Sequence, residues 1–226
     1  MQMVAVTAHS SAVEQSLAEF RATRESTLAT TKRLSQRDFD YSPAPNRWSI
    51  GEVLDHVLLA ERLNREQIAK LIQLKRAGQR PELVLTFSDL NISVVGVPRS
   101  LLTLLEGPLT LMNMFVPDAL RNYLTRKRLV PFRNPDVATP RRGRPGVELR
   151  GDLSASLHET ERLFQDNPDL DYDEMVVQHP LLGRYDVPGL LGFMAAHEQR
   201  HQSQIAEIQR APQFPASAGC CGGSYA

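Results

Sequence analysis

Apolar residues recur at helical spacing in four long segments of the chain. A recurrence every three or four residues places these side chains on one face of a helix, where they can form a core. The segments predict helices over about residues 11–34, 49–78, 147–165 and 187–210. Strand patterns are confined to "ELVLTF" (82–87) and "ISVVGV" (92–97), and neither has a hairpin partner nearby. We therefore predict an all-α protein.

The second predicted helix has the clearest boundaries. It opens with "SIGE" at 49–52, a capping box in which the Ser49 hydroxyl accepts a free backbone amide and Glu52 reaches back to the cap. Gly78 ends the helix, and Pro81 follows shortly afterwards. This segment is expected to be a well-fixed element of the fold.

A long, proline-rich connection separates the second helix from the third. It covers residues 79–146 and is expected to contain one or two short helices around 99–128. Four amphipathic helices with one long connection predict a four-helix bundle with a crossover. We expect a single domain over 1–210. The segment 211–226 is rich in Pro, Gly, Ala and Ser, and we expect it to form a flexible C-terminal tail.

The overall charge of the chain excludes general attraction to polyanions. The 226 residues include 26 Lys and Arg and 26 Asp and Glu, so the formal net charge is zero. Such a chain has no overall field that draws it to nucleic acid or to an anionic membrane. Basic residues nevertheless gather locally over 121–150. Both a solvated crossover and a docking site for an anionic substrate or surface fit this local pattern.

Three sequence features indicate a cytoplasmic protein. The most apolar run, 101–116, is too short to span a bilayer and is interrupted by Gly107-Pro108. The N-terminal segment lacks the charged and apolar regions of a signal peptide. Cys220 and Cys221, the only cysteines, are adjacent in the tail and provide no disulfide framework.

Two histidines of the last helix are expected to face the core. On a helical wheel, His197 and His201 share one sector of roughly 80° with the apolar stripe formed by Leu190, Met194, Ile205 and Ile208. A buried polar ring without a partner costs about 1–3 kcal/mol, so both rings need one. A metal ion would satisfy both, because the imidazole nitrogen is a strong ligand. Hydrogen bonds to carboxylates on other helices are the alternative.

The stretch "HEQRH" (197–201) has the spacing of a zinc-protease helix, but its surroundings exclude that class. In those enzymes the helix turns after the second histidine and brings a third ligand back. Here the sequence continues as "HQSQIAEIQR", without a glycine or another helix breaker. Glu207 would lie about 9 Å further along the axis and on another face.

A third ligand must therefore come from another helix. The remaining histidines are His9, His56, His158 and His179, and His56 is the best placed because it lies in the capped second helix. Three histidines with open coordination positions are typical of a catalytic rather than a structural site. Imidazole ligands suit zinc, nickel or iron, and the sequence does not choose among these metals.

These motifs together resemble the DinB-like (YfiT-like) superfamily of metal-binding helical bundles. The matching segments are "RWSIGEVLDHVLLAE" (47–61) and "HPLLGRYDVPGLLGFMAAHEQRHQSQI" (179–205), and the resemblance runs from about residue 12 to 210. It implies an up-down-down-up bundle, often dimeric, with a divalent metal at His56, His197 and His201. The long basic crossover and the Cys-Cys tail depart from shorter members of the superfamily.

The resemblance also implies a function. Characterised relatives are transferases or isomerases that use low-molecular-weight thiols, so we expect a metal-dependent enzyme that transfers such a thiol to a small electrophile. A metal-dependent hydrolase is one alternative, and a non-catalytic, metal-stabilised binding or stress-response protein is another.

Three acidic residues could assist the metal. Glu198 lies about 60° around the helix from His201. It is a candidate catalytic residue that orients a ligand or accepts a proton, although an exposed surface acid fits the pattern as well. Glu52 and Asp55 are alternative carboxylates that could support the site from the second helix.

Overall fold

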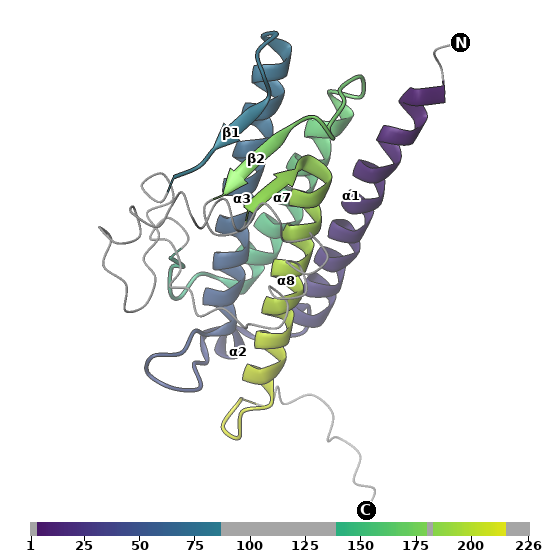
Figure 1. Ribbon diagram of the computed structural model, residues 1–226. Coiled ribbons are helices and arrows are strands. Elements are labelled where there is room, and N and C mark those ends of the chain that lie inside the picture. The colour runs from purple at the N-terminus through teal and green to yellow at the C-terminus, as the bar shows by residue number, and fades with distance from the viewer. Residues whose placement is uncertain (1–3, 87–138, 180–182, 216–226) are drawn as a thin grey trace, which may run out of the picture.

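The structure is a computed structural model that describes residues 4–86, 139–179 and 183–215. Its helices and strands follow one another along the chain as shown in Figure 1: α1 (Val4–Thr31), α2 (Gln36–Asp40), α3 (Ile50–Arg76), β1 (Glu82–Val84), α7 (Gly146–Gln165), β2 (Val176–His179), β3 (Gly183–Asp186) and α8 (Val187–Gln209).

The four long helices form a bundle. α1 and α8 run in one direction, and α3 and α7 run in the other (Figure 1). Each long helix packs against two neighbours, in the order α1, α8, α3, α7 around the bundle. Because α3 and α7 are parallel neighbours, the end of α3 and the start of α7 lie at opposite ends of the bundle. The predicted up-down-down-up bundle with a crossover after its second long helix is therefore confirmed.

Helix boundaries agree closely with the sequence patterns, with one exception. Glu52 N donates to Ser49 Oγ at 3.2 Å and Ser49 N donates to the Glu52 carboxylate at 2.9 Å, which confirms the capping box of α3. The expected start of the first helix at about residue 11 is wrong, since α1 already begins at Val4. The apolar marks begin only at Val13, so the first turns gave no periodic signal.

A small sheet that the sequence analysis missed covers one end of the bundle. Its order is β1-β2-β3, with β1 parallel to β2 and β2 antiparallel to β3. The strand candidate in "ELVLTF" exists as β1, and its partner is not a hairpin neighbour but the distant strand β2, which pairs with it in parallel. β2 and β3 are four residues long, too short for alternation to show. "ISVVGV" lies outside the described residues.

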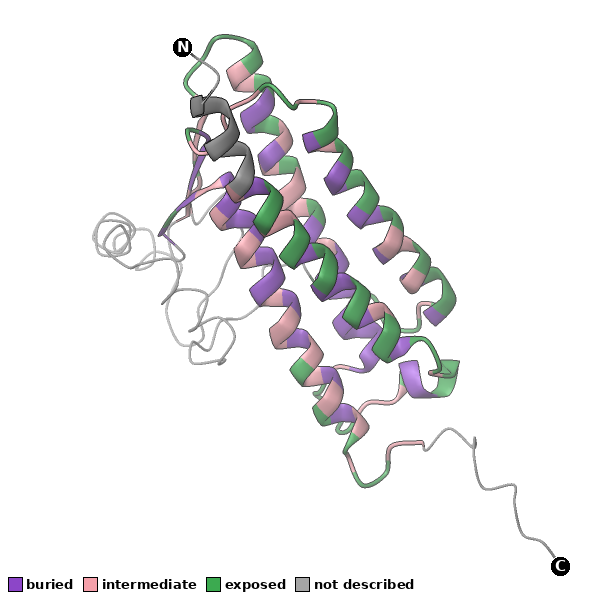
Figure 2. Cartoon of the chain, turned by 90° about the vertical axis from the view of Figure 1, so that its right-hand side faces the viewer, coloured by how far each residue is buried: buried purple, intermediate pink, exposed green. Residues whose placement is uncertain are grey.

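Apolar side chains form two separate clusters along the bundle axis. One includes Phe20, Leu71 and Leu191 and lies beneath the sheet, and the other includes Leu54 and Leu153 and lies toward α2. Buried positions follow the inner face of each helix, and exposed positions follow the outer face (Figure 2).

Between the clusters, each long helix contributes buried polar residues. They are Arg24 and Thr27 of α1, Glu61 of α3, Ser156 and Thr160 of α7, and Glu198 and His201 of α8. A polar layer thus interrupts the core, and it carries the candidate chemistry.

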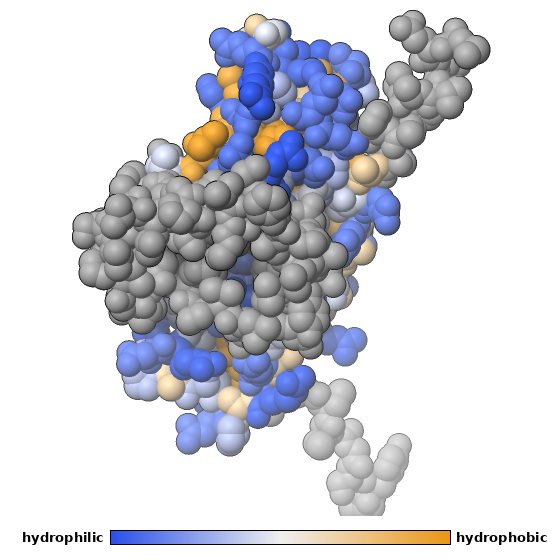
Figure 3. Space-filling view, in the orientation of Figure 1, coloured by the Kyte–Doolittle hydropathy of each residue, from blue (hydrophilic) through white to orange (hydrophobic). Residues whose placement is uncertain are grey.

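The described surface is largely hydrophilic on the face seen in Figure 3. Among the described residues, the exposed large apolar side chains are Val84 and Val147, which belong to separate elements. None of the described helices combines the length and apolar character that a membrane crossing requires.

The end of the last helix is followed by a packed segment. The Phe214 ring meets the Tyr41 ring edge-to-face, with centroids 5.4 Å apart, and it packs against the cluster near α2. Any loosely packed tail therefore begins after Phe214.

Several predictions fall outside the described residues. These are the short helices expected around 99–128, the basic residues 121–138 and the two cysteines. The division into a domain over 1–210 and a tail stays a prediction.

Candidate metal centre

Three histidines converge between α3 and α8. Nε2 of His197 lies 3.3 Å from Nε2 of His56 and 3.2 Å from Nε2 of His201. All three candidate ligand atoms lie within 4.8 Å of one another. Within the part of the chain that the structure describes, this is the single group of three or more metal-ligating side chains.

The spacing of the three nitrogens fits one metal ion. Two imidazole nitrogens bound to a tetrahedral metal at about 2.0–2.1 Å are separated by about 3.3–3.4 Å. The two shortest separations in the cluster match this value closely. The three histidines can therefore hold one divalent metal ion, with coordination positions left for a further ligand.

Gln204 sets the orientation of one ligand. Nδ1 of His201 lies 3.0 Å from Oε1 of Gln204, one turn further along α8. An amide oxygen only accepts, so the proton of the neutral ring lies on Nδ1 and the lone pair of Nε2 points into the cluster. A hydrogen bond of this kind commonly orients metal-binding histidines.

The surroundings of His197 favour its neutral form, which is the state that binds metal. Loss of hydration lowers the pKa of His197 well below its usual value, and the nearby His201, His56 and Arg200 lower it further. His56 and His201 are buried, whereas His197 is partly exposed. The site is thus accessible on the side of His197.

Aromatic rings enclose the cluster. The ring centroid of Trp48 lies 5.0 Å from that of His56, and Phe193 stacks on His197 at 6.0 Å. These contacts restrict the rotation of both imidazoles and displace water from their faces. They support the ligand geometry from the chain segment before α3 and from the first turns of α8.

The other candidate histidines do not join the cluster. The side chain of His158 is 68% exposed and lies 3.3 Å from Glu161 on α7. His179 ends β2 and pairs with Gly183. The side chain of His9 lies outside the described residues. Among the histidines whose side chains are described, His56 alone therefore completes the pair on α8.

Glu198 is buried and ion-paired, so its interpretation as an exposed surface acid is wrong. Its side chain lies beneath α1, where Oε1 lies 2.9 Å from Arg24 Nε and accepts a 2.6 Å hydrogen bond from the Thr27 hydroxyl. Oε2 accepts from Arg24 Nη2 at 2.9 Å. A helical wheel gives the direction of the Glu198 side chain, but it does not show which neighbouring helix covers that side chain.

Glu52 and Asp55 have structural contacts instead. Glu52 belongs to the capping box. Asp55 accepts from the backbone N–H of Arg141 at 2.7 Å and from Arg144 Nη1 at 2.5 Å. Arg144 also binds Asp152, so the described end of the basic crossover is fastened to α3 and α7 by ion pairs.

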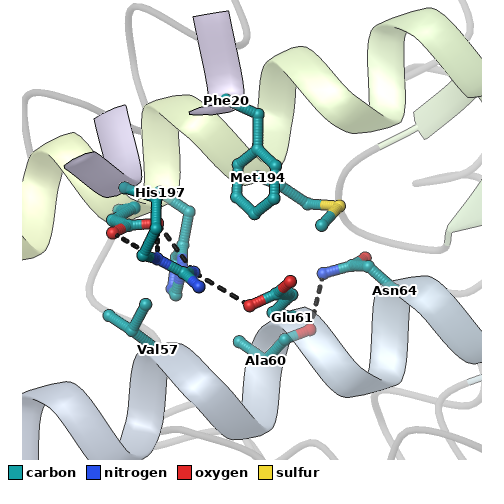
Figure 4. Close-up of a pocket in the computed structure, with 9 residues that line it drawn as sticks. Phe20, Val57, Ala60, Glu61, Asn64, Met194 and His197 are labelled. Atoms are coloured by element: carbon teal, nitrogen blue, oxygen red, sulfur yellow. Dashed lines mark hydrogen bonds and ion pairs between the residues drawn. The ribbon is translucent and has the colours of Figure 1, made fainter. Parts of the chain in front are cut away.

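A small polar hollow adjoins the histidines. His197 and Glu61 face it from α8 and α3 (Figure 4), and Arg24, Asn64 and Glu198 also line it. The sequence analysis did not single out Arg24, Glu61 or Gln204. A signal was available for Gln204, since the segment "HQSQ" places it one turn after His201. No pattern in the sequence connects Arg24 to residues more than 100 positions away.

In a comparison with protein-family models, the model of the DinB superfamily matches residues 19–205. The chain belongs to the DinB superfamily. The matched range begins within α1, ends within α8 and contains all three histidines. Searches of curated proteins and of solved structures give no match. The DinB superfamily is metal-binding, in agreement with the geometry of the cluster.

Proposed function

We propose that this DinB-superfamily protein is a metal-dependent enzyme that transfers a low-molecular-weight thiol to a small electrophile. His56, His197 and His201 would hold zinc, nickel or iron. The observation that carries the proposal is the convergence of three imidazoles, with Nε2 of His197 3.3 Å from that of His56 and 3.2 Å from that of His201, beside the partly exposed His197. All three ligands are neutral, so the charge of the metal is not cancelled by its own ligands.

The residues of the chain prepare this site for nucleophile activation. When bound, the metal supplies Lewis acidity that lowers the pKa of a thiol or a water in its open positions. Gln204 keeps the His201 proton on Nδ1. Trp48 and Phe193 hold the rings of His56 and His197 and keep water from their faces. The partly exposed side of His197 leaves an approach for the thiol and the electrophile.

Glu198 acts in this proposal as a positioning residue. Arg24 and Thr27 engage both of its carboxylate oxygens, and a proton would have to displace these contacts. Glu198 is adjacent to His197 on α8. Its contacts with Arg24 and Thr27 therefore hold the part of α8 that carries His197 against α1. Proton transfer by Glu198 is therefore disfavoured.

Hydrolysis is the second candidate function. The hollow beside His197 has room for about one water molecule. A water held there would lie beside the metal centre. A homodimer and a cytoplasmic location stay predictions.

The test combines metal content with a thiol-conjugation assay. The purified protein is analysed for transition metals, and several cellular thiols are offered with an aryl halide as electrophile. His201→Ala and His201→Gln are expected to lose the metal and the conjugation activity while keeping the helical circular-dichroism signal. His158→Ala, which changes an exposed histidine, is the matched control and should retain both.

Three outcomes separate the candidates. Conjugation that persists in folded, metal-free His201→Ala protein would refute the proposed mechanism. Metal binding without conjugation of any thiol, but with hydrolysis of activated esters or amides, would favour the second candidate. Metal binding with neither activity would favour a non-catalytic role.

A further inference from the structure

Arg24 connects all four long helices from the centre of the polar layer. Its side chain is fully buried on α1. Nε lies 2.9 Å from Glu198 Oε1 on α8, Nη2 lies 2.9 Å from Glu61 Oε2 on α3, and Nη1 donates to the Leu153 carbonyl on α7 at 2.6 Å. All three guanidinium nitrogens are therefore engaged. We call Arg24, Glu61 and Glu198 the buried ionic network.

The buried ionic network carries an excess of negative charge. Two carboxylates against one guanidinium leave a formal charge of −1. A further cation, Arg65, lies 3.7 Å from Glu61 Oε1, but Arg65 also pairs with Glu159 at 2.7 Å. Thr160 donates one hydrogen bond to the Glu61 carboxylate, and Thr27 donates one to the Glu198 carboxylate.

The network and the histidines share space and helices. Arg24, Glu61 and Glu198 line the same small hollow as His197 (Figure 4). Glu198 is adjacent to His197 on α8, and Glu61 lies little more than one turn beyond His56 on α3. The two helices that supply the metal ligands are therefore joined, next to those ligands, through one guanidinium.

A dication changes the charge balance of this core. Three neutral imidazoles do not neutralise the two positive charges of the ion. In a poorly hydrated site, such charge is unfavourable in free energy unless an opposite charge compensates it. A nearby group of charge −1 attracts the ion, and the attraction is stronger than in water because the intervening protein has a low dielectric constant. Without the ion, the same excess charge lies buried and only partly compensated.

We propose that the buried ionic network is the electrostatic support of the metal centre. It holds α3 and α8 at the spacing that the three imidazoles require, and its excess charge favours the bound dication. This inference rests on the proposed function, because it assumes the metal site described above. Arg24, Glu61 and Glu198 are positioning residues in this role, since they act on the ion through the helices and through the field.

The decisive variant is Glu61→Gln, which removes the excess charge with little change of shape. The amide oxygen can still accept from Thr160, and Arg24 keeps Glu198. Co²⁺ is titrated into metal-free protein, and its visible absorption bands report binding. We expect Glu61→Gln to bind Co²⁺ about tenfold or more weakly, the range seen when groups that support metal ligands are changed. Because Arg24 loses one of its two buried partners, the metal-free variant should melt below wild type, but it should keep the wild-type helical signal at the temperature of the titration.

Glu159→Gln is the matched control. It removes the same charge from the same neighbourhood, but Glu159 is 47% exposed and its field is screened by water. We expect Co²⁺ affinity to change by no more than about twofold in this variant. Glu198→Gln provides a second test of the network, because its amide oxygen can still accept from Thr27. It too should weaken Co²⁺ binding by about tenfold or more.

The outcomes distinguish this inference from the proposed function. Wild-type affinity in both Glu61→Gln and Glu198→Gln, with both proteins folded, would overturn the inference and leave the metal site intact. An equal loss of affinity in Glu61→Gln and Glu159→Gln would also overturn it, since general surface charge would then be responsible. A wild-type chain that binds no Co²⁺, Zn²⁺ or Ni²⁺ would overturn both.

Discussion

Replacing Arg24 by methionine tests whether the polar layer stabilises the bundle. Met has similar length but no charge, so Glu61 and Glu198 would remain buried without their shared cation. Breaking a buried ion pair from one side typically costs about 3–5 kcal/mol. In a chain of this size, 1 kcal/mol lowers the melting temperature by about 2–4 °C. We therefore expect Arg24→Met to melt about 6–20 °C below wild type.

The assay is thermal unfolding followed by circular dichroism, with both proteins free of metal. Arg76→Met is the control, because Arg76 pairs with Asp169 at the surface, where the two side chains are 44% and 63% exposed. Exposed ion pairs contribute little to stability because water screens them, so this control should melt within about 4 °C of wild type. An Arg24→Met protein that melts as high as the control would refute the reasoning.

A compensated variant separates the loss of charge balance from the loss of packing. Replacing Arg24, Glu61 and Glu198 together by Met, Leu and Met removes all three buried charges. Apolar replacement of a whole buried ion group is often neutral or stabilising. We expect the triple variant to recover most of the stability lost in Arg24→Met. If the triple variant is less stable than Arg24→Met, the network must stabilise the bundle through contacts other than the balance of its charges.

Substitutions at three further positions test local features by thermal unfolding or metal titration. Gly146→Ala should destabilise the fold by about 1–3 kcal/mol, because its Cβ would lie 2.8 Å from atoms of the buried Phe39 ring. Gly151→Ala, also in α7, meets nothing within 4 Å and should stabilise by about 0.5–1 kcal/mol; a loss of stability there would contradict the helix-propensity argument. Gln204→Ala should weaken Co²⁺ binding by about 10–100-fold, because His201 Nδ1 loses its acceptor, whereas Gln204→Glu should preserve binding. Equal affinity of the two Gln204 variants would refute the orienting role.

The long helices and the three-histidine cluster were predictable because local patterns encode them. The capping box at Ser49 and the apolar stripe of α3 are short-range features, and both were confirmed. The inward direction of His197 and His201 follows from helical geometry alone. His56 could be preferred over His158 because a capped helix start fixes its position in the bundle.

The sheet and the buried ionic network were not predictable, because both depend on contacts between distant segments. β1 pairs with β2 across more than 90 residues, and neither strand is long enough to show alternation. Glu198 was misjudged for the same reason. Its neighbour Arg24 lies on α1, and only the packing of α1 against α8 brings the two charges together.

The contact between Trp48 and His56 makes the tryptophan fluorescence of this protein sensitive to the proposed metal site. Trp48 is the only tryptophan of the chain, so it supplies nearly all of the long-wavelength emission. Its ring lies 5.0 Å, centroid to centroid, from that of a proposed metal ligand. Paramagnetic ions at that distance quench an indole strongly, while a closed-shell ion alters its emission mainly through the local field. Entry and exit of different ions could therefore be followed in real time, without a dye, from a probe that the chain already contains.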